Sequence, residues 1–118
     1  MIYSMKIDEN KIYKVSLVIK PVTDTQRWVQ DDTIPTICHD FYISGKDYNE
    51  ECRRTFLAQA RKLAENMAEG ASVWGKKYNI EYSVLITETC PVVMNNSTYY
   101  FSGRKESCRL GYGWIMHK

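Results

Sequence analysis

The chain lacks the features that mark membrane and exported proteins. None of its apolar runs approaches the roughly twenty residues that a membrane span requires, and charged residues interrupt the amino-terminal segment where a signal peptide would carry an apolar block. Four cysteines are present, but no two have the short Cys-x-x-Cys spacing of zinc and redox sites. We therefore expect a cytoplasmic protein with no membrane partner, free cysteines and no structural zinc.

Residues suited to catalysis are equally scarce, with only two histidines, His39 and His117. His39 falls on the predicted buried face of a strand, where a core role is more common than catalysis. Its neighbour Cys38 would point to the other face, so the two cannot form a nucleophile–base pair. No motif for nucleotide, kinase or hydrolase chemistry occurs. We expect a protein that is not an enzyme and that needs neither metal nor cofactor.

What the sequence does contain is the composition of one ordinary globular domain spanning residues 1–118. Hydrophobic residues make up 44% and charged residues 25% of 118 residues. Nine tyrosines and three tryptophans are many for this length. Tyr and Trp are enriched at protein interfaces, although they are also common in β-sheets that have one solvent-exposed face. The net charge of +2 is far from the basic surface of a dedicated nucleic-acid binder.

Residues 47–75 predict one long amphipathic helix. Its apolar positions recur at spacings of three and four residues, which place them on one helix face: Cys52, Phe56, Ala60, Leu63, Ala64, Met67, Ala71 and Trp74. Asp47 and Glu50 resemble a capping box at the amino end. Gly75 suits the left-handed position that ends many helices.

The flanking segments predict strands, because apolar and polar residues alternate there with a period of two. The alternating runs are 13–19, 37–43, 80–86 and 110–116, and 92–94 with 98–101 form a hairpin around Asn95-Asn96-Ser97. Ile2, Met5 and Ile7 suggest a further strand before a turn at residues 8–10. Pro21 should end its strand or lie where the strand is at a sheet edge.

We predict an α+β fold in two layers, in the order β-β-α-β-β-β. The helix packs on one face of a mainly antiparallel sheet of about five or six strands, because short connections favour antiparallel pairing.

A domain of this kind without catalytic groups is expected to act by binding. The leading hypothesis is a protein–protein interaction module that occupies a partner's surface, in the manner of phage or mobile-element inhibitors of host machinery. That comparison rests on small size and absent motifs alone. Binding of nucleic acid through a basic, aromatic-bearing surface is one alternative. A small ligand held between sheet and helix, with His39 and tyrosines as polar contacts, is another.

The predicted binding residues lie outside the helix stripe. Trp28, with Arg27 beside it, stands in a polar run without periodic apolar neighbours and is a candidate interface anchor; the alternative is that it folds back on the sheet edge. The remaining candidates are basic or aromatic and belong to the carboxy-terminal third: Arg104, Lys105, Arg109, Tyr99 and Tyr112. A protein partner is expected, nucleic acid is the alternative, and a homodimer is a further one.

Overall fold

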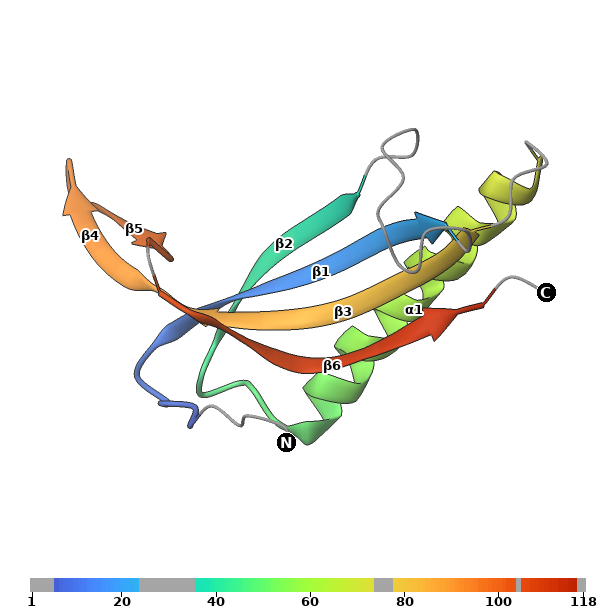
Figure 1. The fold of residues 1–118 in the computed structure, drawn as a ribbon. Helices are drawn as coiled ribbons and strands as arrows, with labels where there is room; N and C mark the ends of the chain where they lie inside the picture. Colours follow the sequence, from blue (N-terminus) through green and yellow to red (C-terminus); the bar gives the residue numbers. More distant parts are fainter. Residues whose placement is uncertain (1–5, 24–35, 74–77, 104, 117–118) are drawn as a thin grey trace.

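The structure is a computed structural model that describes residues 6–23, 36–73, 78–103 and 105–116 (Figure 1). The elements follow the chain as β1 Ile12–Thr23, β2 Ile37–Ser44, α1 Glu50–Val73, β3 Tyr78–Glu88, β4 Cys90–Met94, β5 Ser97–Phe101 and β6 Ser107–Ile115. The predicted α+β class is confirmed, with one helix on a mainly antiparallel sheet. One more strand follows the helix than the predicted order contains, and the strands divide into two sheets.

The main sheet has the strand order β2-β1-β3-β6, and every neighbouring pair is antiparallel. Alternation on β1 sends Tyr13, Val15, Leu17 and Ile19 to the helix side, where all are buried. The register pairs Val15 with Ile86 and Leu17 with Val84, so the apolar sides of β1 and β3 coincide. In Figure 1 the helix lies on one side of this sheet, and the β4–β5 hairpin curls away from the helix at one end.

Small residues let α1 approach the sheet closely. Ala60 and Ala64 are fully buried in the core between α1 and the strands. On β6, Gly111 leaves room for the helix, since an added Cβ would stand 2.6 Å from Leu57 Cδ2. The Arg53 guanidinium then donates a hydrogen bond of 3.0 Å from Nη1 to the Leu110 carbonyl oxygen, which joins α1 to β6. The helix is thus fixed over β1, β3 and β6.

The start of the helix differs from the predicted one. The Asn49 side chain caps it, because Oδ1 accepts a hydrogen bond of 2.8 Å from the Cys52 amide, and the Asn49 carbonyl accepts the Arg53 amide. Asp47 instead belongs to the preceding turn, where its amide donates to the Ser44 carbonyl. Asp47 and Asn49 are both residue types that cap helices. Because the turn after β2 includes Asp47, the helix begins after Asn49.

Two further expectations are corrected by the sheet. Ile7 lies outside any strand, so the suggested amino-terminal strand does not include it, and residues 1–5 are outside the described part. His39 is exposed, not buried, because β2 is an edge strand that α1 covers only in part. Pro21 lies within β1 but beyond the end of β2, so β1 is locally an edge there, as one of the predicted options required.

Replacing Asn49 by Ala should lower the free energy of unfolding by about 1 kcal/mol, because the Cys52 amide loses its acceptor. Asp47→Ala is the matched control and should leave the midpoint of urea denaturation nearly unchanged. If Asp47→Ala is the more damaging of the two, the cap is wrongly assigned.

Phe56→Ala should cost about 3–5 kcal/mol, because Phe56 is buried and its ring meets Phe41 edge-on with centroids 5.0 Å apart. Leu63→Ala should cost less, since Leu63 is only partly buried. Asn66→Ala, at an exposed position of the same helix, should have little effect. Equal midpoints of chemical denaturation for Phe56→Ala and Asn66→Ala would show that the helix face is misassigned.

Candidate functional site

The most unusual part of the chain is a stretch without any charge. Fifteen consecutive residues, 89–103, contain no Lys, Arg, Asp or Glu in a protein that is 25% charged overall. This stretch contains both strands of the β4–β5 hairpin. Uncharged apolar segments normally enter a core, so the position of this one needs an explanation.

The hairpin is a separate two-stranded sheet. Asn95 and Asn96 have φ values of 51° and 63°, the pair of left-handed residues that a tight two-residue hairpin turn requires. Cross-strand partners share a face, so Val92 lies opposite Tyr99 and Val93 opposite Thr98. Since adjacent residues point to opposite faces, both faces of the hairpin carry apolar side chains.

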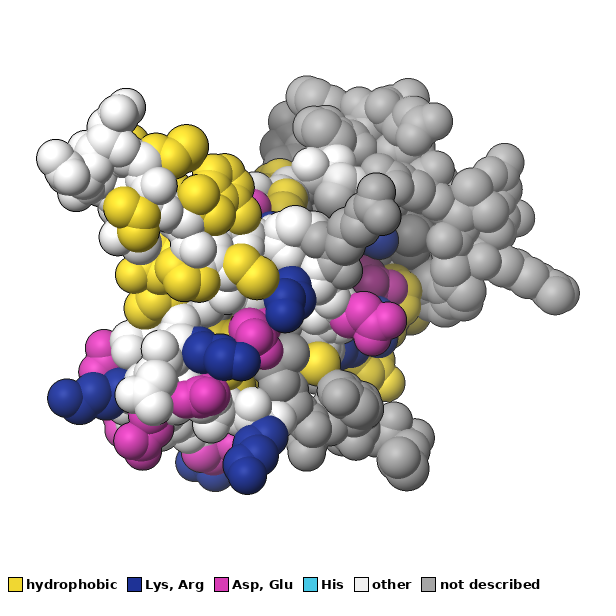
Figure 2. Space-filling view, turned by 90° about the vertical axis from the view of Figure 1, so that its left-hand side faces the viewer, with side chains coloured by type: hydrophobic (Ala, Val, Ile, Leu, Met, Phe, Trp, Pro, Cys, Tyr) yellow, Lys and Arg dark blue, Asp and Glu magenta, His cyan; other side chains and the backbone are white. Residues whose placement is uncertain are grey.

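Neither face of the hairpin is covered. All residues of β4 and β5 are exposed, and the exposed fraction reaches 71% at Val93. The large apolar side chains involved are Val92, Val93, Met94, Tyr99, Tyr100 and Phe101. Among the described helices and strands, β4 and β5 pack substantially only on each other. Figure 2, viewed from the hairpin end, shows apolar side chains gathered apart from the charged ones.

The base of the hairpin is held to the main sheet by polar contacts. The Thr89 hydroxyl and amide both donate to the Ile12 carbonyl oxygen, at 2.6 and 3.2 Å. On the other strand, Lys14 Nζ donates to Ser102 Oγ at 3.2 Å. The hairpin therefore leaves the sheet in a defined direction although its strands project outward.

An ion pair adds to this attachment. Lys11 Nζ lies 2.7 Å and Lys105 Nζ 3.7 Å from Glu88 Oε1. The hydrogen bond from Lys11 lowers the pKa of the Glu88 carboxyl below its usual value. The contribution of Glu88 is therefore present at neutral pH and is lost as the pH falls through this lowered pKa.

The structure separates the residues predicted to bind. Tyr99 lies on the hairpin with 47% of its surface exposed. Lys105 lies at the base of the hairpin beside Glu88. Arg109 and Tyr112 are on β6, on the face of the sheet opposite the helix, where the Arg109 guanidinium carbon lies 4.9 Å from the Tyr112 ring centroid. Arg27, Trp28 and Arg104 lie outside the described residues.

The sequence predicts a hairpin here, and of its residues only Tyr99 and Tyr100 are expected to form part of a binding surface. Val92, Val93, Met94 and Phe101 were treated as ordinary strand residues. The available signal was the absence of charge over residues 89–103, because a strand that only closes a sheet usually carries polar residues on its wet face.

The described residues contain no group of three or more His, Cys, Asp and Glu side chains placed to hold a metal ion. None of the described helical residues form a segment long and apolar enough to cross a bilayer. The chain matches no protein-family model, no curated protein and no solved structure.

Proposed function

We propose that this chain is a small cytoplasmic binding protein that acts by occupying the surface of a protein partner, with the β4–β5 hairpin as its docking element. The observation that carries the proposal is the exposure of six large apolar side chains on a hairpin without charge. Exposed apolar patches rimmed by polar residues mark interaction sites in soluble proteins. The four free thiols support the cytoplasmic setting.

The hairpin has the composition of an interface centre. Aromatic residues and Met are enriched at the centres of interfaces, and charged residues are depleted there. The hairpin has no charged residue, and it has three aromatic residues and one Met: Tyr99, Tyr100, Phe101 and Met94. Lys105 and Glu88 at the base provide charged groups for a polar rim.

The backbone of the hairpin offers a second means of binding. β4 and β5 pair only with each other among the described strands, so each has one outer edge, and that of β5 carries unpaired amide and carbonyl groups without a proline, whereas Pro91 lacks an amide on β4. Such edges accept an added strand from a partner, whose side chains then fit between the apolar ones. Soluble proteins usually protect free edges with charge, proline or a bulge; Pro91 does so on β4, whereas β5 has neither charge nor proline.

Nucleic acid is the weaker alternative for this surface. The hairpin presents no cation, whereas phosphate contacts dominate affinity for nucleic acid. Of the basic residues nearby, Lys105 is paired with Glu88 and Arg109 stacks on Tyr112. A second copy of the chain is the other alternative, because antiparallel strand edges are self-complementary.

A photo-crosslinking amino acid at position 100 tests the proposal in the cells that make the protein. Tyr100 is exposed on the hairpin, and Tyr42, exposed on β2, is the matched control position. Position 100 should give one protein adduct of defined mass that position 42 does not give. With that protein purified, the double change of Val92 and Val93 to Thr should weaken binding about tenfold or more.

The melting temperature of the Val92→Thr, Val93→Thr variant should stay unchanged, because these side chains lie outside the core. An adduct of twice the chain's own mass would show that the hairpin binds a second copy of the chain and not a different protein. An adduct destroyed by nuclease would favour nucleic acid. Equal yields of adduct from positions 42 and 100 would contradict the role of the hairpin.

The charge at Arg109 should affect the rate of association more than the lifetime of the complex. Arg109→Glu is expected to slow association at low salt, with the difference shrinking as salt is raised, because charges outside the buried contact steer encounters through a field that salt screens. Stopped-flow mixing with the identified partner measures this. A change confined to the dissociation rate would instead place Arg109 inside the buried contact.

A further inference from the structure

A groove lies between β2 and α1, on the helix side of the sheet. Because α1 packs mainly over β1, β3 and β6, it covers the apolar side of the edge strand β2 only in part, at Phe41. The resulting groove has a volume of about 610 Å³, within the range of about 300–1,000 Å³ typical of small-molecule sites. It is separate from the hairpin and is independent of the proposed function.

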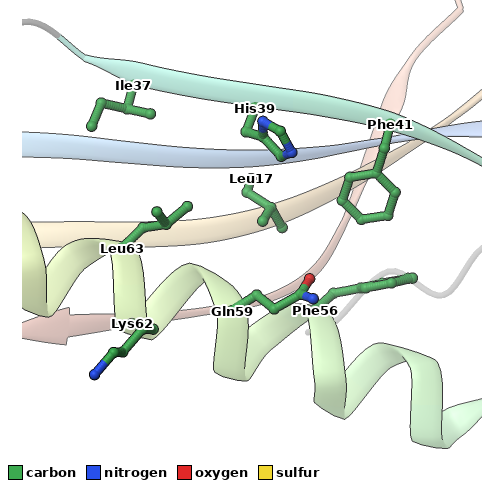
Figure 3. A pocket seen from close by; sticks show the side chains of 8 residues that line it. All are labelled: Leu17, Ile37, His39, Phe41, Phe56, Gln59, Lys62 and Leu63. Carbon is green, nitrogen blue, oxygen red and sulfur yellow. The ribbon is translucent and has the colours of Figure 1, made fainter.

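The groove has an apolar floor and one closed end. Leu17 of β1 forms the floor, and the rings of Phe41 and Phe56 meet edge-on at one end with centroids 5.0 Å apart (Figure 3). Ile37 and Leu63 face each other across the other end. Ile37 is 39% exposed, so the groove stays open to solvent there. From Ile37 to Phe41 the strand extends about 13 Å.

The described polar groups at the groove carry no negative charge. His39 projects from β2 between the apolar side chains, and Gln59 and Lys62 lie on the helix opposite. None of the described Asp and Glu residues lines the groove. Lys62 forms no salt bridge with another described residue, whereas the neighbouring Arg61 is paired with Glu65 at 3.1 Å. The rim therefore includes one lysine that forms no salt bridge with the described residues; in Figure 3 its ammonium group points away from Leu17, so the side chain must turn to bring the charge to the apolar trough.

We propose that this groove binds an amphipathic carboxylate, a molecule with an extended apolar body and one anionic group. The body would lie along Leu17 between Ile37 and Leu63, with its end against the Phe41–Phe56 pair. The anionic group would stay at the solvent-exposed rim, where Lys62 can turn its flexible side chain toward it and the Gln59 amide can donate a hydrogen bond. Burial of the body supplies the affinity, and the Lys62 charge selects the sign of the head group.

Titration of the isotope-labelled full chain with decanoate, followed by NMR, tests this site. Decanoate has an extended chain and can be used well below its micelle concentration. We expect saturable shifts of amides in β2 and in the middle of α1, around residues 56–63, with little change in β4 and β5. Decyltrimethylammonium, with the same chain and opposite charge, should bind at least tenfold more weakly.

Variants separate the two parts of the ligand. Lys62→Gln should weaken the affinity for decanoate about three- to fivefold, the scale of one exposed ion pair. The same change should not weaken the affinity for decyltrimethylammonium. Lys20→Gln, on the other side of the sheet, should bind decanoate like the unaltered chain. Ile37→Ser should reduce the binding of both ligands while leaving the melting temperature near its original value, since Ile37 is on an exposed edge.

Shifts centred on the β4–β5 hairpin, shifts that do not saturate, or equal affinity for the two head groups would overturn the proposal. Loss of decanoate binding in Lys20→Gln to the same degree as in Lys62→Gln would do so as well, because it would show a response to overall charge alone.

Discussion

The width of a single helix determines how this domain is arranged. A helix with its side chains is about 10 Å across, while neighbouring strands lie about 4.8 Å apart, so one helix covers two or three strands. The main sheet has four strands, and α1 is placed over β1, β3 and β6. The helix covers β2 only in part, and both the exposure of His39 and the groove beside Phe41 follow from that placement.

The same limit leaves the β4–β5 hairpin outside the core. The buried residues come from α1 and the four-stranded sheet, and none of them belongs to β4 or β5. Polar contacts at Thr89 and Lys14 hold the base of the hairpin in place without covering its apolar faces. The molecule thus has two parts. One is a packed domain, which needs no partner to bury its core, and the other is a projecting hairpin whose apolar surface is not covered by any described part of the chain.

Much of the architecture could be predicted from alternation and helical spacing. The periods at Tyr13–Ile19, at Ile80–Ile86 and along Phe56, Ala60 and Ala64 are set by which side of each element is buried, and the structure buries those sides. Alternation assigns a residue to a face but says nothing about how far the helix reaches across that face. For this reason His39 was wrongly expected to be buried.

The other differences also have local causes. Asp47 and Asn49 are both suitable caps, and only the turn from Ser44 shows which one begins the helix. The apolar residues of the hairpin resembled those of the core strands, and their exposure depends on the absence of any second helix over them among the described residues. An apolar pattern in the sequence shows which side chains could be buried. Whether they are buried depends on whether another helix or strand packs over them.

Excision of the hairpin tests the central claim most directly. Cys90 and Phe101 are cross-strand partners, so Thr89 and Ser102 can be joined by a two-residue Asn-Gly turn in place of residues 90–101. We expect a chain that keeps its melting temperature and its main sheet but no longer binds the protein captured through position 100. A shortened chain that unfolds would show that the hairpin belongs to the folding unit, and one that still binds the partner with full affinity would show that the docking surface lies elsewhere.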